Sequence, residues 1–169
     1  MLQAGWLLLG AMTIGGALGA HRSLRSYRLA LGALSALYLG LGAAANAAFL
    51  LVGSTYAHFA EASQFAFVRD TWESLVVPHE RLFITALVLF EAAVGVLLLV
   101  GGRARQVALV LIAAFNVAVL AFSWWYAPWS VPMVVAVVLL LRAGRTWSAG
   151  VSPAPSSSRS AGPAATAPG

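Results

Sequence analysis

The sequence contains no cysteine and few charges: its ten basic side chains are all arginine, and only five residues are acidic. Without cysteine, the chain itself supplies no disulfide, thiolate metal site, iron–sulfur cluster or dithiol redox centre. Charged residues make up 9% and hydrophobic residues 61% of the 169 residues, which is typical of membrane proteins and not of soluble domains. The net charge of +5 would suit nucleic acid. Because no basic stripe is interleaved with aromatic residues, no nucleic-acid partner is predicted.

Five long apolar runs lie between the charged residues. Because about 20 apolar residues in a helix cross a bilayer, the sequence predicts an all-α membrane protein, a compact bundle of five transmembrane helices. Their expected bounds are 2–20, 29–53, 82–102, 107–125 and 129–142. The last run is short and would rely on the aromatic residues before it or on a locally thin bilayer, with Pro132 in its first turn. No positive charge precedes the first run, which favours a retained helix over a cleaved signal peptide.

The arginines indicate how the bundle is oriented. Arg69 and Arg81 fall in the loop 54–81. The other eight flank the remaining helix ends or lie in the C-terminal tail: Arg22, Arg25, Arg28, Arg103, Arg105, Arg142, Arg145 and Arg159. Arginine-rich loops stay in the cytoplasm, so we expect a multi-pass protein of the plasma (inner) membrane. Its N-terminus would be outside and its C-terminus cytoplasmic, as five spans require.

The two segments outside the apolar runs differ in character. Within residues 54–81, apolar residues recur at helical spacing with charged residues on the other face, and Pro78 ends the pattern. The apolar positions are Phe65, Val68, Trp72, Leu75 and Val76. This pattern predicts an amphipathic helix in an external loop, lying on the outer membrane surface or capping the bundle. Residues 148–169 are mostly Ser, Ala, Pro and Gly and predict a disordered cytoplasmic tail.

Small residues recur every fourth position in the first two helices. The second helix has Gly32, Ala36, Gly40, Ala44 and Ala48, and the first has Ala11, Gly15 and Gly19. Such stripes let another helix backbone approach closely. We interpret them as packing surfaces inside the bundle, with a homodimer face as the alternative.

Glu91 is the only acidic or basic residue in the middle of an expected transmembrane helix. A charge at that depth is costly, so we expect a protonated carboxyl that donates to a neighbour. Counting by helix rise puts Tyr38 and Asn116 at a similar depth, with Thr13 close by. The sequence thus predicts an intramembrane polar cluster of Glu91, Asn116 and Tyr38. It is either a proton-carrying or ligand-holding site, for example against a quinone carbonyl, or a polar clasp between helices. Asn46, farther out, is predicted to be a helix-packing contact.

His58, His79 and Arg81 lie in the external loop near helix ends, where a site at the membrane edge would form if there is one. We expect surface histidines, because paired haem ligands lie on facing helices and no expected transmembrane helix contains a histidine. A catalytic pair of His79 and Glu80 is the alternative, and no metal site is predicted. No nucleotide, serine-nucleophile or zinc motif is present. Enzymatic activity therefore stays open, at most as a quinone-linked oxidoreductase subunit.

From residue 28 to residue 148 the order of features resembles the DoxX family of small four-helix membrane proteins. The resemblance rests on Arg28-Leu-Ala-Leu-Gly32, the external loop, Phe90-Glu91-Ala-Ala-Val-Gly95 with the leucines up to Gly101-Gly102, a short arginine turn, and Leu141-Arg-Ala-Gly144-Arg145-Thr-Trp-Ser148. It implies a four-helix core to which the helix at 2–20 is added. It also implies that Glu91 occupies the family's membrane carboxylate position, with Gly95 beside it. The lysine that the family often carries after its first core helix is missing.

The resemblance implies a fold more than a reaction, because family members include the membrane subunit of a thiosulfate:quinone oxidoreductase and many proteins of no settled activity. The first hypothesis is an accessory or scaffold subunit of a redox or cell-envelope complex, or a homo-oligomer. The alternatives are a quinone-interacting membrane subunit of an oxidoreductase, and a small proton-coupled transporter. Quinone is the one cofactor suggested. A transporter would be expected to have inverted repeats or broken helices, and the sequence shows neither apart from the short last run.

Overall fold

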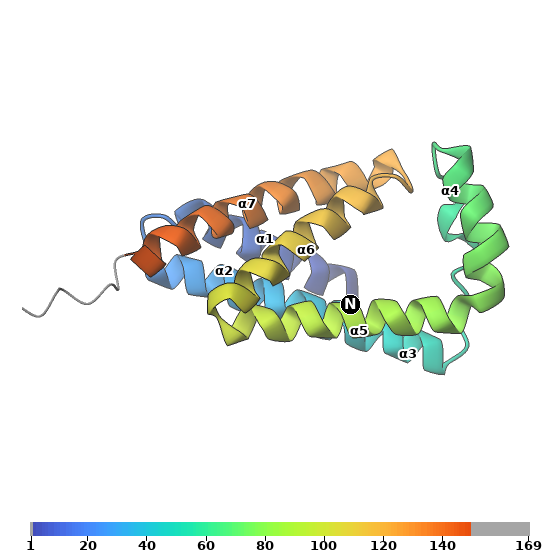
Figure 1. Cartoon of the computed structure of the whole chain (residues 1–169), viewed down its shortest axis with the longest axis horizontal. Helices are drawn as coiled ribbons and strands as arrows, with labels where there is room; N and C mark the ends of the chain where they lie inside the picture. Colours follow the sequence, from blue (N-terminus) through green and yellow to red (C-terminus); the bar gives the residue numbers. More distant parts are fainter. Residues whose placement is uncertain (1, 150–169) are drawn as a thin grey trace, which may run out of the picture.

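The computed structural model describes residues 2–149, with side chains from 3 to 147, and this part of the chain contains helices and no strand. The main helices are α1 (Leu2–Gly19), α2 (Leu24–Ala36), α3 (Ala45–Leu51), α4 (Ala66–Thr71), α5 (Glu80–Val100), α6 (Gly102–Val119) and α7 (Ala127–Ala149), as Figure 1 shows. A π-helical stretch, Leu37–Ala44, joins α2 to α3 without a break. A second one, Trp72–Val76, lies between α4 and α5. The expected tail falls outside the described residues, apart from the last two positions of α7.

Local sequence explains where the helices start and stop. Ser23 caps α2, its hydroxyl accepting from the Ser26 amide at 3.3 Å, and Ser123 does the same for the turn that leads into α7. Gly53 follows α3 with a φ of 73°. Gly101 and Gly102 separate α5 from α6 with φ values of 92° and 56°, which a side chain disfavours. The two glycines thus allow the turn at which α5 ends and α6 begins.

Four segments of the described chain are long and apolar enough to cross a membrane: Leu24–Leu51, Ala66–Val100, Gly102–Val119 and Trp124–Trp147. The helix expected at 129–142 is longer than predicted, and Pro132 lies inside it, beyond the first turn. That expectation was wrong because the aromatic residues before position 129 are themselves helical. The last helix is therefore among the four candidate spans, whereas α1 is not.

The helices form a closed bundle in which the first and the last helix are neighbours. At one end of this pair the rings of Trp6 and Trp129 meet edge to face, 5.4 Å between centroids. At the other end the Trp147 indole donates to the Ala20 carbonyl at 3.0 Å. On its other side α1 packs antiparallel against α2, where a Cβ at Gly16 would lie 2.9 Å from the Ala30 Cβ. Small and aliphatic residues from all the long helices fill the core.

The small-residue stripe of the second helix faces away from the bundle. Gly32, Ala36, Gly40, Ala44 and Ala48 are all exposed, and a Cβ at Gly32 or Gly40 would meet nothing within 4 Å. The interpretation of this stripe as internal packing was therefore wrong. Of the predicted stripe in α1, Ala11 and Gly15 are exposed, whereas a Cβ at Gly19 would lie 3.1 Å from the Ser26 hydroxyl of α2. The tightest approaches in α1 are at Gly10, against Trp129, and at Gly16. A repeat of small residues marks a smooth face, but the repeat alone does not say which face is turned inward.

Residues 54–79, here called the cap segment, cross one end of the bundle, with α4 standing across the long helices in Figure 1. Ser63 donates to the Ala121 carbonyl at 2.8 Å, and the Gln64 amide donates to the Leu120 carbonyl at 2.9 Å. The cap segment is thereby tied to the far end of α6. Of the expected apolar face, Val76 is buried, whereas Phe65 is 44% and Leu75 48% exposed.

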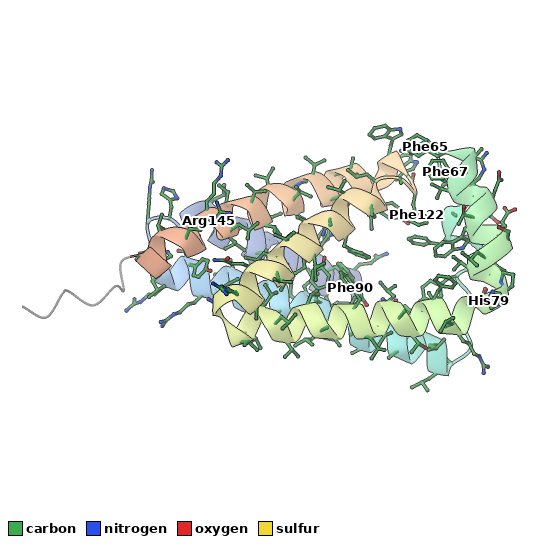
Figure 2. All side chains as sticks on the ribbon, viewed as in Figure 1. Phe65, Phe67, His79, Phe90, Phe122 and Arg145 are labelled. Carbon is green, nitrogen blue, oxygen red and sulfur yellow. The ribbon has the colours of Figure 1, made fainter. Side chains whose placement is uncertain are left out.

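Seven arginines gather at the opposite end, where α1, α5 and α7 end and α2 and α6 begin. Figure 2 shows Arg145 at this end and Phe65, Phe67 and His79 at the capped end. The seven are Arg22, Arg25, Arg28, Arg103, Arg105, Arg142 and Arg145. This region is called the arginine end below.

Candidate ligand site inside the bundle

A cavity of about 420 Å³ lies under the cap segment, inside the bundle. Side chains of α1, the π-helical stretch, α3, α5, α6, α7 and the cap segment all line it. Its wall is mainly aromatic and aliphatic, with Trp6, Phe49, Leu87, Phe115 and Met133 among the residues that form it. A mainly apolar hollow of this size with a few polar groups has the general form of a small-molecule site.

Glu91 lies in this cavity and is 5% exposed. Its carboxylate Oε2 accepts a hydrogen bond of 2.8 Å from the Asn46 side-chain amide. The expected partners were Tyr38 and Asn116, and that part of the prediction was wrong. Asn46, expected to be only a packing contact, holds the carboxyl in place.

Tyr38 and Asn116 do lie together, but they bond to each other. The Asn116 amide donates to the Tyr38 hydroxyl at 3.1 Å and to the Ile112 carbonyl at 2.9 Å. Both side chains are buried and line the same cavity as Glu91. Thr13 does not join them, because its hydroxyl donates to the Leu9 carbonyl of its own helix. The cavity therefore has two separate polar pairs on its wall.

The π-helical stretch brings the second helix against the carboxyl. A Cβ at Gly42 would lie 2.7 Å from Oε1 of Glu91 and 2.8 Å from its Cδ, so only glycine leaves room for the carboxyl. One turn after Glu91 on α5, Gly95 packs in the same manner against Leu39. The Gly95 carbonyl accepts a hydrogen bond of 2.8 Å from the Ser35 hydroxyl. π-Helical turns inside α-helices are frequent at functional sites. Here the π-helical stretch places Gly42 beside the Glu91 carboxyl, and it orients the following helix so that Asn46 donates to this carboxyl.

Ser130 supplies a further polar group from α7. Its side chain is 0% exposed and lines the cavity, and its hydroxyl has no hydrogen-bond partner among the described residues. A buried hydroxyl without a partner loses the hydrogen bonds that water would give it. Its position in the cavity wall leaves it available to a bound molecule.

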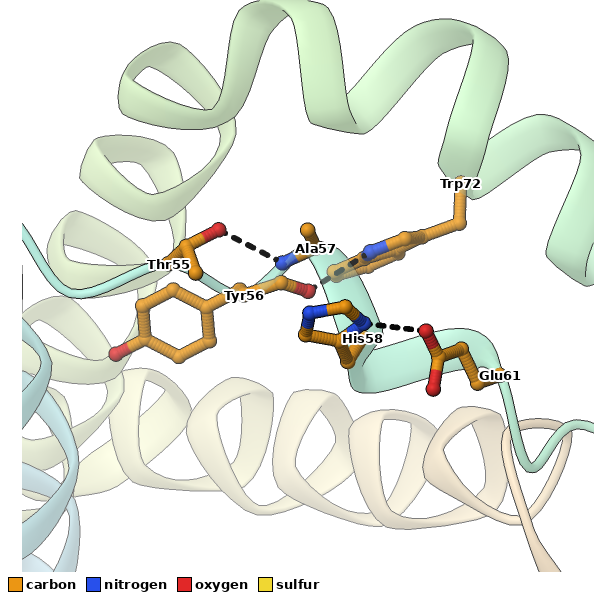
Figure 3. A network of polar contacts seen from close by, with 6 residues as sticks. All are labelled: Thr55, Tyr56, Ala57, His58, Glu61 and Trp72. Atoms are coloured by element: carbon orange, nitrogen blue, oxygen red, sulfur yellow. Dashed lines mark hydrogen bonds and ion pairs between the residues drawn. The ribbon is translucent and has the colours of Figure 1, made fainter.

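The cap segment lines one end of the cavity with aromatic rings and reaches the carboxyl through Tyr56. The Tyr56 hydroxyl donates to Oδ1 of Asn46 at 2.8 Å. The Tyr56 carbonyl accepts from the Trp72 indole at 3.0 Å (Figure 3). Burial and then the nearby carboxylates of Glu91 and Glu80 raise the pKa of Tyr56, so its phenol stays protonated as a donor. The Glu80 carboxylate accepts from the Tyr56 amide and from Thr55. The chain Trp72–Tyr56–Asn46–Glu91 thus links the cap to the carboxyl.

Phe59 is the centre of the aromatic part of the cap. Its ring lies 5.4 Å from that of Trp72, 5.0 Å from Phe122 and 5.9 Å from Tyr126. Trp72 and Phe122 also meet edge to face at 5.4 Å. These rings hold the cap segment against the turn between α6 and α7.

The external residues singled out from the sequence do not form one site. His58 pairs with Glu61 (Figure 3), and this hydrogen bond raises the pKa of His58. His79 instead contacts the Leu75 carbonyl at 3.0 Å, and Arg81 is exposed. Within residues 2–149 no three His, Asp or Glu side chains are grouped as metal ligands would be.

Comparisons of the chain with models of protein families, with curated proteins and with solved structures found no match. The resemblance to the DoxX family therefore stays an expectation from the sequence.

Sequence reasoning missed three residues of the cavity. Asn46 was noticed but assigned to packing, and Tyr56 and Ser130 were not singled out. A serine in the aromatic-rich start of a helix and a tyrosine in a loop carry no pattern of their own. Only the fold brings them to Glu91 and its cavity.

Proposed function

We propose that this protein is a membrane-embedded subunit that holds a lipophilic, carbonyl-bearing molecule of quinone type in the cavity under the cap. The observation that carries the proposal is the combination of a buried carboxyl, Glu91, with an unpartnered buried hydroxyl, Ser130, in one apolar cavity of about 420 Å³. Apolar walls suit a ring that partitions into lipid, while the two polar groups suit its carbonyl oxygens.

The residues have distinct roles in this proposal. Asn46 and Gly42 fix the position of the Glu91 carboxyl, which when protonated donates to a carbonyl oxygen. The Ser130 hydroxyl is a second donor, from α7. The aromatic rings of the cap exclude water from the cavity, which strengthens both hydrogen bonds. A quinone would supply electron and proton transfer when bound, and the protein's own part is to bind it and hold a proton near its oxygen.

Binding can be tested with the full chain purified in mild detergent. We expect a short-chain quinone analogue to quench part of the tryptophan fluorescence and to raise the thermal midpoint, since Trp6, Trp72 and Trp129 line the cavity. Glu91→Leu should abolish the shift. Glu91→Gln keeps the shape of the side chain and should leave the fold intact. Glu73→Gln, an exposed carboxylate outside the cavity, is the matched control and should bind as wild type does.

Two results would contradict the proposal. One is a flat titration with every quinone analogue. The other is an equal thermal shift from a hydrocarbon of the same size without carbonyls, which would make the cavity a site for an acyl chain. If Glu91→Gln itself fails to fold, the acid proton is structural and Glu91 is a clasp between helices.

A role inside a larger membrane assembly is favoured by a separate observation. The stripe from Gly32 to Ala48 is exposed along the length of the second helix, and small residues on a lipid-facing surface are where transmembrane helices associate. We infer that the protein works as an accessory subunit or homo-oligomer that packs through this face. Gly40→Leu should shift the protein to a smaller assembly in native gels of mild-detergent extracts. An unchanged assembly would contradict this role.

The arrangement of arginines supports a topology. We infer five spans, with α1 as the fifth and the arginine end in the cytoplasm of a plasma (inner) membrane, because seven arginines gather at one end of the bundle. Reporters fused to the two termini should then be active on opposite sides of the membrane. Activity of both on one side would contradict the fifth span.

A further inference from the structure

A second cavity, of about 470 Å³, opens at the arginine end between α2, α6 and α7. Its floor is apolar, with Leu31, Leu109 and Leu140 at most 5% exposed. Its rim carries Arg28 and Arg105. The cavity combines two cations with an apolar floor, and it shares no lining residue with the cavity under the cap.

Arg105 is held in place by the chain itself. Its Nε donates to the Leu98 carbonyl at 2.9 Å, and its guanidinium lies over the Tyr27 ring, 5.9 Å from the centroid. Tyr27 is in turn fixed by Gly144, where a Cβ would meet the Tyr27 hydroxyl at 2.8 Å. These contacts use the backbone and a ring, so they leave the positive charge of Arg105 without a counter-charge.

The described residues supply no carboxylate to this end of the bundle. All five acidic residues lie in the cap segment, at the start of α5 or at Glu91. Among the described residues the only ion pair is that of His58 with Glu61, at the opposite end. The two arginines that flank this apolar hollow thus offer their positive charge to an anion from another molecule.

We propose that this cavity binds the phosphate group of an anionic membrane lipid, with Arg28 and Arg105 on the phosphate and the lipid's apolar part along Leu31, Leu109 and Leu140. Arginine is well suited to phosphate because its planar donors match the oxygens. Basic pockets between transmembrane helices on the cytoplasmic side are typical sites for lipid headgroups. The apolar floor favours a lipid over a free phosphate ion. The site is independent of the proposed quinone site.

The test uses delipidated full chain in detergent, titrated with brominated phosphatidylglycerol, whose bromines quench nearby tryptophan. Trp147 lines the cavity, so the difference between wild type and Trp147→Phe reports on this site. We expect half-quenching at a lower concentration of phosphatidylglycerol than of brominated phosphatidylcholine. Arg28→Gln should weaken the phosphatidylglycerol response about five-fold, and Arg28→Lys should weaken it less.

Arg25→Gln is the matched control. Arg25 lies on the same helix, is exposed like Arg28 and does not line the cavity, so its loss removes the same charge from the same end. Equal weakening by both variants, or equal affinity for the two lipids, would overturn the proposal and leave the arginines with a role in topology alone. Displacement of the lipid by inorganic phosphate would overturn the lipid assignment and give the site to a soluble phosphate. Quinone binding in Arg28→Gln should be unchanged, which separates this result from the first proposal.

Discussion

At the capped end of the bundle each inward carboxylate has a partner on the chain: Glu91 bonds to Asn46, and Glu80 bonds to Thr55 and the Tyr56 amide. At the arginine end Arg105 donates to the Leu98 carbonyl and lies over the Tyr27 ring. No arginine among the described residues forms an ion pair with a carboxylate. The inward carboxylates of the capped end are therefore hydrogen-bonded within the chain, while the arginines of the other end have no carboxylate partner among the described residues. The first should depend on the sequence of the chain, and the second on the lipid.

The largest effect is expected from filling the space beside Glu91. Gly42→Leu places atoms where the carboxyl lies, 2.7 Å from a Cβ, and should cost about 3 kcal/mol of stability by overpacking. Gly15→Leu adds the same side chain on α1, outside the stripe from Gly32 to Ala48 and where nothing lies within 4 Å, and should cost little. Thermal unfolding in detergent at fixed protein concentration gives the comparison. Equal midpoints for the two variants would show that the capped end is looser than its contacts suggest.

Removing the partner of Glu91 should have the next largest effect. Asn46→Leu leaves a buried carboxyl without its hydrogen bond and should cost about 2 kcal/mol. The double variant with Glu91→Leu removes the unpaired carboxyl and should recover part of that loss, while the Tyr56 hydroxyl still lacks its acceptor. Chemical unfolding of both single variants and the double variant measures the coupling. Additive losses would mean that the two residues act independently, and would contradict a capped end whose carboxyl depends on a partner in the chain.

The aromatic contacts of the cap should contribute less. Phe59→Leu loses the ring contacts with Trp72, Phe122 and Tyr126 and should cost about 1 kcal/mol. If the cap opens locally, trypsin should cut after Arg69 about five times faster. Phe67→Leu is the control, because Phe67 is 67% exposed and contacts only Phe65 among the described rings. Equal cleavage rates in both variants would place the closure of the cap elsewhere.

The smallest effect concerns His58 and Glu61. Their hydrogen bond raises the pKa of His58, so the stabilisation is present below the ordinary histidine pKa of about 6.5 and is lost as the pH rises through the raised pKa. Both side chains are largely exposed, which keeps the effect small. An NMR titration should show the pKa of His58 falling back toward its ordinary value in Glu61→Gln. No change between the two proteins would remove this pair from the capped end.

Sequence patterns predicted the helical class well, since lipid leaves the backbone few alternatives to helix and apolar runs are long. The four candidate spans overlap four of the expected helices, but their bounds differ, and the span Ala66–Val100 begins well before the expected start at residue 82. The partner of Glu91 was not predictable, because depth counting assumes an unbroken α-helix. The π-helical stretch at Leu37–Ala44 has more residues per turn, so it changes which residues of α3 face α5.

The direction of the small-residue stripe was not predictable for a different reason. Inside a soluble protein, a glycine and alanine face is easily told from a polar outer face. In lipid both faces are apolar. The sequence pattern around Gly32 and Gly40 is therefore the same whether this face contacts another helix or an acyl chain. Tyr56 and Ser130 reach the cavity only through contacts between segments far apart in the chain, which no local pattern encodes.

The contacts of α1 with α7, through Trp6 with Trp129 and Trp147 with Ala20, set an order of assembly. In the five-span arrangement proposed above, α1 is synthesised before α7, so one flank of α1 stays uncovered until α7 arrives. The cavity under the cap stays open on its α7 side until then, and the ring of helices closes in a single late step. A chain stopped before α7 would leave Trp6 without its contact to Trp129.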